Sequence, residues 1–163
     1  WRSMMLMKIE CWFIGKTNEN YLNDGIDIFI KRLKRYLPIQ VVIIPDVRQA
    51  GSMEKVRLKK EEAFLIEKRL KPGDMLILLD ENGKQFSSVQ LAERVNHWLN
   101  LPGQRLIFLV AGAYGADESL KSLASEKLSL SELTFSHQMV RLFLVEQLYR
   151  TMSILNNEPY HNS

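Results

Sequence analysis

Residues 106–115 read LIFLVAGAYG, and this stretch decides the fold class. Its first half is a continuous apolar run, which is typical of a strand buried on both faces of a sheet. Gly112 and Gly115 then interrupt the run, and residues 113–127 lead into a helix. A buried strand that turns through glycines into a helix is the repeating unit of layered α/β domains.

The same unit recurs on both sides of this stretch. Apolar or β-branched runs predict strands, and apolar residues at helical spacing predict helices. The expected strands are residues 7–15, 39–45, 74–80 and 104–112, with the alternation at 128–135 as a candidate fifth. The expected helices cover about 20–37, 52–70, 87–99 and 136–155, and a turn is expected at 81–84. Because strands alternate with helices, we expect an α/β fold with a mainly parallel sheet and helices on both faces.

Length and hydropathy exclude several classes of protein. With 163 residues the chain fits one domain, which we expect to cover residues 7–163. We interpret residues 1–6, WRSMML, as a leader left by cloning or by an upstream start, since their apolar part is too short for a signal peptide. A membrane helix needs about 20 apolar residues, and no run approaches that length, so we expect no membrane partner.

The cysteine, the histidines and the net charge further narrow the possible classes of protein. The single cysteine, Cys11, cannot form an internal disulfide, which favours a reducing compartment. His97, His137 and His161 show no metal-ligand spacing, so we expect no metal. The net charge of +3 is compatible with a nucleic-acid partner but does not require one.

Two basic clusters are candidate phosphate-binding surfaces. Residues 55–60 are balanced at once by Glu54, Glu61 and Glu62, so a solvated helix face is the better interpretation. Residues 31–36, KRLKRY, have no acidic neighbours, and for them phosphate binding and simple solvation both stay open.

Parallel sheets bind ligands outside the carboxyl ends of their strands. The loops that follow expected strands here are residues 80–84, 111–115 and 131–136. Gly112 and Gly115 would let backbone amides approach an anionic ligand, but a tight turn without any ligand explains them equally well. Asp80 either holds a ligand hydroxyl or caps its own turn. The absence of GxGxxG disfavours a dinucleotide.

The C-terminal part is the densest in chemistry. In LTFSHQMVRLFLVEQLYR (133–150), Ser136 or Thr134 fits a helix cap, and His137 follows in a first turn, where a structural role is commoner than a catalytic one. NNEPYHNS (156–163) ends the chain on an aromatic and an imidazole behind a proline, which is unusual for a terminus. From the residues alone the chain is an α/β ligand-binding domain, and enzyme activity stays open.

Three separate motifs together resemble one known family. LIFLVAGAYG, LSLSELTFSHQMVRLFLVEQLYR (128–150) and NNEPYH (156–161) resemble, in order and spacing, the RlmH family of SPOUT-class methyltransferases. MKIECWFIGKT (7–17) and LLDENGKQFSS (78–88) resemble the same family, so the likeness covers nearly all of residues 7–161.

This resemblance implies an S-adenosylmethionine-dependent methyltransferase that acts on N3 of a pseudouridine. The substrate would be helix 69 of 23S ribosomal RNA in the assembled 70S ribosome, and the enzyme would be a cytoplasmic homodimer that needs no metal. The resemblance also implies a C-terminal trefoil knot. General topology rules argue against knots, so this expectation depends on the resemblance alone.

Carried over by position, the resemblance implies a methyl-donor site and a catalytic group. The donor site would comprise Leu79, Gly112, Ser131, Glu132, Leu133, Thr134, Phe135 and Ser136. The catalytic residues would be His137, Arg150, Tyr160 and His161. The donor residues lie at the same strand ends that the parallel-sheet rule selects.

The terminal pair has a chemical role open to it. N3 of pseudouridine carries a proton and is a poor nucleophile until it loses that proton, so the enzyme has to position two reactants and remove the proton. Histidine accepts a proton near neutral pH, which makes His161 the candidate acceptor, with His137 or a water as alternatives. Tyr160 would stack on or hydrogen-bond the base, and Pro159 would limit the movement of the tail.

Two positions depart from the family pattern. Ala111 stands where many relatives have glycine, which alters the backbone approach to a ligand. Asn162 stands where relatives often have a basic residue, which removes a contact to a phosphate.

Two rival functions stay open beside the methyltransferase. One is a non-catalytic module that binds the ribosome or a nucleotide, for which donor binding is absent or the tail is inert. The other is an α/β enzyme that uses a different adenosyl or nucleotide ligand.

Overall fold

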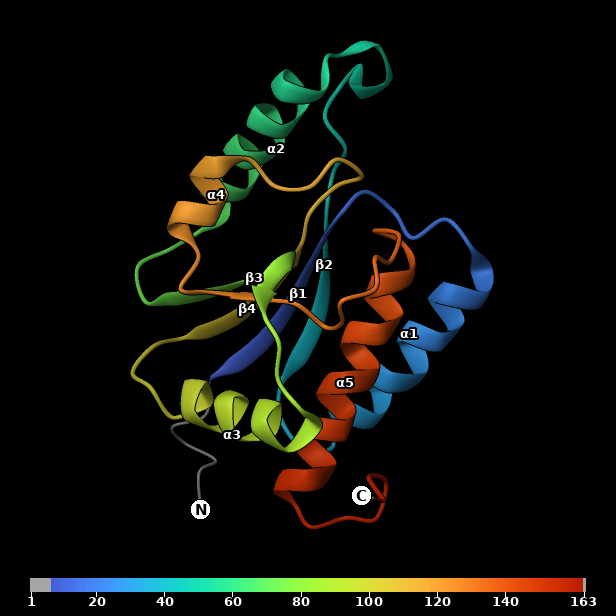
Figure 1. Ribbon diagram of the computed structural model, residues 1–163, viewed down its shortest axis with the longest axis vertical. Helices are drawn as coiled ribbons and strands as arrows, with labels where there is room; N and C mark the ends of the chain where they lie inside the picture. The colour runs from blue at the N-terminus through green and yellow to red at the C-terminus, as the bar shows by residue number, and fades with distance from the viewer. Residues whose placement is uncertain (1–6, 163) are drawn as a thin grey trace.

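The structure, a computed structural model, describes residues 7–162. Residues 1–6, the expected leader, lie outside the described residues. The described chain forms one five-stranded sheet in the order β2-β1-β4-β3-β5, and every pairing is parallel (Figure 1). The strands are β1 (Lys8–Ile14), β2 (Ile39–Ile44), β3 (Asp74–Lys84), β4 (Arg105–Val110) and β5 (Glu126–Leu128). The predicted parallel sheet is confirmed.

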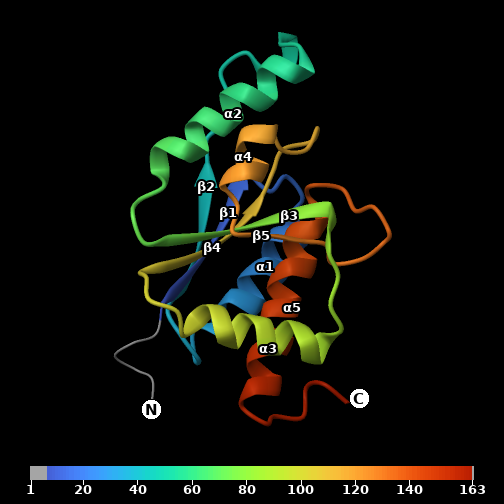
Figure 2. The same ribbon diagram turned by 60° about the vertical axis from the view of Figure 1, so that its left-hand side comes forward.

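Helices cover both faces of the sheet, as predicted (Figure 2). On one face lie α1 (Asn20–Leu33), α3 (Ser88–Leu99) and α5 (Met139–Leu155). On the other face lie α2 (Lys55–Arg69), which a short 3-10 turn (Ala50–Ser52) precedes, and α4 (Glu118–Leu123). These layers make the sheet the buried centre of the molecule.

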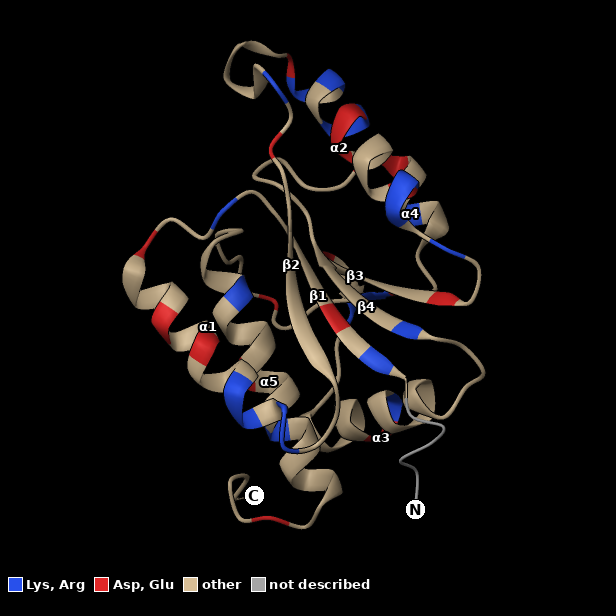
Figure 3. Ribbon diagram, turned by 180° about the vertical axis from the view of Figure 1, so that it is seen from behind, with Lys and Arg blue, Asp and Glu red and all other residues tan. Residues whose placement is uncertain are grey.

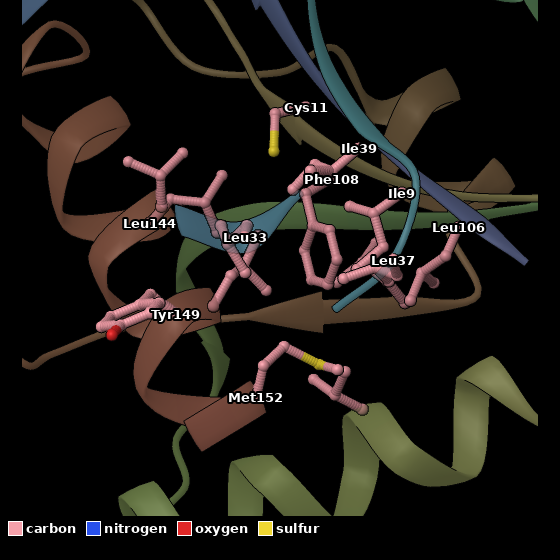
Figure 4. Packing of buried hydrophobic residues seen from close by; sticks show 14 of the residues in the cluster. Ile9, Cys11, Leu33, Leu37, Ile39, Leu106, Phe108, Leu144, Tyr149 and Met152 are labelled. Atoms are coloured by element: carbon pink, nitrogen blue, oxygen red, sulfur yellow. The ribbon is translucent and has the colours of Figure 1, made fainter. Parts of the chain in front are cut away.

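The core follows the twofold alternation of a strand. In β1, Cys11 and Phe13 pack toward α1 and α5, whereas Trp12 and Ile14 pack toward α2. Cys11 is fully buried, and burial raises the pKa of its thiol to about 12, so it is inert packing rather than a nucleophile. Figure 4 shows Cys11 and Phe108 of the sheet together with Leu33 of α1 and Leu144 of α5 in the first of these layers.

The strand order fixes where a ligand site belongs. The chain moves from β1 outward to β2, then crosses to β3 on the other side of β4. The order therefore reverses between β1 and β4, and such a switch point leaves a crevice at the carboxyl ends of the strands. The glycines Gly15 and Gly112 follow these two central strands.

Two predicted helix boundaries were wrong. Helix α1 ends at Leu33 rather than at residue 37, and residues 34–36 form a turn instead. Pro38 disfavours a helical conformation in the residue before it, which loosens the end of the helix. Helix α5 begins at Met139 rather than at residue 136. Ser136 still serves its start, because Ser136 Oγ accepts a hydrogen bond from the Met139 amide at 3.0 Å.

Two predicted strand boundaries were also wrong. Strand β3 continues through residues 81–84, where a turn was expected, because Lys84 pairs with Leu128 beyond an irregularity in the ladder. The close approach requires glycine: a Cβ at Gly83 would lie 2.6 Å from the Lys127 backbone. The fifth strand is Glu126–Leu128, and residues 129–135 form a loop rather than a strand. The trefoil knot stays a prediction.

Candidate functional site

A pocket of about 440 Å³ opens at the carboxyl edge of the sheet. Its floor is set by strand register, because Leu79 of β3 pairs with Val110 of β4 on one side and Leu128 of β5 on the other. All three residues line the pocket. Three segments far apart in the sequence therefore meet at one site, as the parallel-sheet rule predicts.

The loop between β5 and α5 forms one wall of this pocket. It is held by its own hydrogen bonds: Ser131 Oγ accepts from the Leu133 amide at 3.0 Å, and Thr134 donates to Glu81 at 3.2 Å. Leu133 is 72% exposed, so an apolar side chain stands open to solvent beside the cavity. The implied donor-site residues that line the pocket are Leu79, Gly112, Ser131, Leu133, Thr134 and Phe135. The other two, Glu132 and Ser136, belong to the same loop without lining the pocket.

Gly112 lies at the bottom of this pocket against a buried carboxyl group. Glu62 of α2 is 8% exposed, and a Cβ at Gly112 would lie 2.6 Å from Glu62 Oε2. Across residues 7–162 no hydrogen bond or ion pair satisfies Glu62. Burial and, to a lesser extent, the nearby Asp46 carboxylate raise the pKa of its carboxyl to about 7. Glu62 is thus poised to change charge near neutral pH.

Arg141 fastens α5 to the carboxyl end of β1. Its guanidinium is 0% exposed and donates to the carbonyls of Ile14 at 2.7 Å and Gly15 at 2.9 Å. It also donates to Thr17 Oγ1 at 3.0 Å and to the His137 carbonyl at 3.0 Å. Burial lowers the pKa of Arg141 to about 10, which still leaves it charged at neutral pH. This residue holds the crevice in shape.

His137 lines the pocket next to that anchor. Burial lowers the pKa of its imidazole, and the Arg141 cation lowers it further. The ring is therefore neutral at neutral pH, with one nitrogen free to donate and one to accept.

The other implied catalytic residues form a second cluster at the far end of α5. Tyr160 donates to Glu146 Oε2 at 2.9 Å, and Arg150 donates to the same oxygen at 2.9 Å and to His161 Nδ1 at 3.2 Å. Burial raises the pKa of Tyr160, and its hydrogen bond to Glu146 raises it further. The ring of Tyr160 packs edge-on against Tyr149 with centroids 4.7 Å apart. The tail is thus folded back onto the helix rather than frayed.

The structure does not bring these two clusters together within one chain. His137 precedes the first turn of α5, whereas Tyr160 and His161 lie beyond its last turn (Figure 1). The helix has 17 residues, and at 1.5 Å per residue it is about 25 Å long. The tail folds back onto Glu146 and Arg150, which lie 9 and 13 residues beyond His137, so the two clusters are about 14–20 Å apart along the helix axis.

The sequence left two roles open for Asp80, binding a ligand hydroxyl or capping its own turn. Asp80 Oδ1 accepts a hydrogen bond from the Asn82 amide at 3.0 Å, which favours its role as a turn cap.

Over the described part of the chain, no three His, Cys, Asp or Glu side chains gather closely enough to hold a metal ion. Nor is any helix there long and apolar enough to cross a membrane.

Sequence reasoning missed two residues of the site. Arg141 falls on the same helical stripe as Leu144 and Leu148, and a charge within an apolar stripe is a signal for a buried anchor. Glu62 had the same signal, because it lies four residues from both Leu58 and Ile66, but its charged neighbours favoured a solvated helix face. Only the packing of α2 over β4 reveals its burial.

Fold and pocket together define a class: α/β proteins with a ligand site at the carboxyl edge of a parallel sheet. Residues 7–161 match the model of the family described as "Predicted SPOUT methyltransferase". The chain belongs to this SPOUT methyltransferase family.

Relatives named "Ribosomal RNA large subunit methyltransferase H" are similar to the chain over almost its full length. The protein of Parabacteroides distasonis is 46% identical over 96% of this chain and 99% of its own length. That of Cytophaga hutchinsonii is 45% identical over 96% of this chain and 100% of its own length. That of Flavobacterium johnsoniae is 46% identical over 96% and 99% of the two chains.

Proposed function

We propose that this protein transfers a methyl group from S-adenosylmethionine to N3 of a pseudouridine in helix 69 of 23S ribosomal RNA, on the assembled ribosome. Such a substrate places it in the cytoplasm. The observation that carries the proposal is the convergence of Leu79, Gly112 and the loop 131–136 on one pocket. The family match and the large-subunit relatives support the reaction class and the RNA substrate.

The pocket fits the methyl donor in size and chemistry. Its volume of about 440 Å³ lies within the range of about 300–1,000 Å³ that small-molecule sites occupy. Leu79, Leu133 and Phe135 offer apolar surface for a purine, and Gly112 leaves its backbone accessible where a side chain would collide with Glu62. The donor supplies an electrophilic methyl on a sulfonium. Glu62 lies behind Gly112, where its carboxylate would favour a cationic ligand on that side of the pocket.

The tail supplies the groups that prepare the base. Arginine has no acceptor, so the contact between Arg150 and His161 has Arg150 donating to Nδ1, and a neutral His161 then carries its proton on Nε2. In this state Nε2 can hold a carbonyl oxygen of the base. To accept the N3 proton, Nδ1 has to lose its hydrogen bond from Arg150 and form one with N3 of the base. Arg150 is then released to bind the RNA.

The separation of tail and pocket supports the homodimer. One chain cannot bring Tyr160 to its own His137 across α5, so a complete site needs the tail of a second copy. A hollow of mixed polarity beside the pocket offers a surface for that copy. Its lining includes the rings of Phe86, Phe135 and Phe143 together with Ser87, Ser88 and Gln147.

The first test is methyl transfer from labelled S-adenosylmethionine to ribosomes that lack the modification. The full-length protein is compared with a version truncated after Glu158. Labelling by the full-length protein alone would establish the enzyme and its tail. Equal labelling would keep the enzyme and remove the tail from the site. No labelling by well-folded protein would overturn the function and favour a non-catalytic binding module.

Mixing two inactive variants tests the shared site. A Gly112→Val chain has a tail but a blocked pocket, and the truncated chain has a pocket but no tail. Refolded together, they form mixed dimers with one working site of two, and each such dimer has up to half of the activity of a wild-type dimer if the tail acts on the partner's pocket. If each tail served its own pocket, the mixture would stay inactive.

A further inference from the structure

A basic cluster occupies the carboxyl end of α1 and the turn that follows it. It consists of Lys31, Arg32, Lys34 and Arg35, and all four side chains are exposed. None of the four forms an ion pair with an acidic side chain of residues 7–162. The acidic residues of α1, Asp24 and Asp27, lie in its first half and at its middle (Figure 3). We call this surface the α1 basic cluster.

Its two arginines are held in place by aromatic rings. The Arg32 guanidinium lies over Phe29 at 5.3 Å and over Tyr149 at 5.5 Å, and that of Arg35 lies over Tyr36 at 5.2 Å. A guanidinium stacked on a ring keeps N–H groups at its edge for a phosphate. The cations are therefore positioned rather than freely solvated.

The cluster is continuous with the C-terminal tail. Tyr149, under Arg32, packs edge-on against Tyr160, and Tyr36, under Arg35, donates a hydrogen bond to Glu158. On the other side of Tyr160 lies Arg150, 4.8 Å above its ring. Cations and aromatic rings thus alternate from α1 to the end of the chain. This interleaving is typical of surfaces that bind RNA strands.

The second basic cluster of the sequence, on α2, differs from the α1 basic cluster both in its neutralisation by acidic residues and in its position relative to the tail. On α2, Arg57 lies 3.9 Å from Glu61 and is partly neutralised by it. That helix covers the opposite face of the sheet, away from the tail (Figure 2). Only the α1 basic cluster combines unneutralised charge with contact to the groups that meet the base.

We propose that the α1 basic cluster binds the sugar–phosphate backbone of the ribosomal RNA strand on either side of the nucleotide that Tyr160 and His161 hold. This inference rests on the proposed function, because it takes the tail as the base-holding element. The cluster supplies affinity and register, and it takes no part in methyl transfer. Phosphate contacts position a nucleic acid without reading its sequence.

The test is a double variant, Lys31→Ala with Lys34→Ala, which leaves the stacked arginines and their packing intact. Each phosphate contact to a single strand contributes about 0.7 to the slope of log K against log salt. Two lost contacts lower the slope by about 1.4 and weaken ribosome binding about 25-fold at 0.1 M salt. Donor affinity, and the methylation rate at saturating ribosomes, stay as in the wild type.

The matched control is Arg57→Ala with Lys68→Ala, which removes two exposed cations from α2. It also lowers the net charge by two, so it separates a local contact from a general field effect. If both double variants bind ribosomes with the same affinity and salt slope, the α1 basic cluster does not contact RNA and the inference fails.

Failure of the proposed function gives a different pattern. A wild-type protein that neither methylates nor binds ribosomes overturns both proposals. A wild type that methylates, with a Lys31/Lys34 variant that matches the control, overturns this inference alone. A loss of donor binding in the Lys31/Lys34 variant also contradicts it, because the cluster is then tied to the pocket instead of the RNA.

Discussion

In residues 7–162, charged side chains at the amino ends of the strands (the amino edge) are paired with one another, whereas those at the carboxyl ends (the carboxyl edge) are not. At the amino edge, Arg105 lies 2.6 Å from one oxygen of Asp74 and 3.2 Å from Glu10, and Lys8 lies 3.4 Å from Glu10, so two cations neutralise two carboxylates. At the carboxyl edge, Glu62 and Asp46 lie near the crevice, and within the described chain neither has an ion-pair partner. Figure 3 shows the charges of the amino edge on neighbouring strands.

The pKa shifts follow the same division. Burial alone would raise the pKa of Asp74, but hydrogen bonds from Arg105 outweigh it and hold that pKa below its ordinary value. Burial raises the pKa of Glu62 to about 7, and no cation reverses the shift. A network in which every charge is paired stabilises the fold, but it has no free acceptor for a ligand. A carboxyl group without a partner lowers stability and remains able to bind a ligand.

The largest effect is expected from breaking the amino-edge network. Arg105→Met leaves the buried Asp74 carboxylate without a cation and Glu10 with Lys8 as its remaining cation, which costs about 3–5 kcal/mol of the free energy of unfolding. Donor affinity of the folded fraction should not change, because this edge is remote from the pocket. Urea unfolding and calorimetric titration with S-adenosylmethionine measure the two quantities.

Arg57→Met is the control for this substitution. It removes an ion pair whose side chains are 71% and 45% exposed, and such pairs contribute about 0–1 kcal/mol. An Arg105→Met protein as stable as this control would contradict the view that the amino edge stabilises the fold.

A smaller effect on stability but a specific loss of binding is expected at the carboxyl edge. In Gly112→Ala the new Cβ displaces the Glu62 carboxyl by which the pocket is shaped, and donor affinity should fall about 100-fold, which equals about 2.7 kcal/mol. Gly51→Ala is the matched control, since its Cβ meets nothing within 4 Å. Equal donor affinities in these two proteins would show that Gly112 does not contact the donor.

The sequence determined the parts of this fold that depend on local pattern. The apolar runs of β1 and β4 and the glycine that follows each are visible in the letters, and so the parallel sheet and its ligand edge were predictable. The same patterns located the pocket loops, because a rule about strand ends needs only the order of the elements.

What the sequence did not show depends on pairing and packing. The continuation of β3 through residues 81–84 depends on the approach of β5, which no local pattern encodes. The burial of Glu62 depends on how α2 lies over the sheet. The separation of His137 from His161 required the direction of α5 in space. Long-range contacts decided each of these features, and local propensity had no information about them.

The smallest effect is a pH dependence that Glu62→Gln should remove. The folded chain raises the Glu62 pKa from 4.5 to about 7, so between these values the folded state holds a proton that the unfolded chain has released. Stability therefore falls as the pH rises through this window, by up to about 3 kcal/mol, which corresponds to the whole shift. The Gln variant should lack this loss and be the more stable protein at pH 8.

Urea unfolding followed by circular dichroism from pH 4.5 to 8 measures this difference. Glu93→Gln, at an exposed position of α3, is the control and should follow the wild type at every pH. If wild type and Glu62→Gln show parallel curves, the Glu62 carboxyl is already paired in solution. The carboxyl edge would then be as satisfied as the amino edge, and the contrast between the two would disappear. Divergent curves instead show that Glu62 is an unpaired carboxyl group behind Gly112 whose ionisation costs stability.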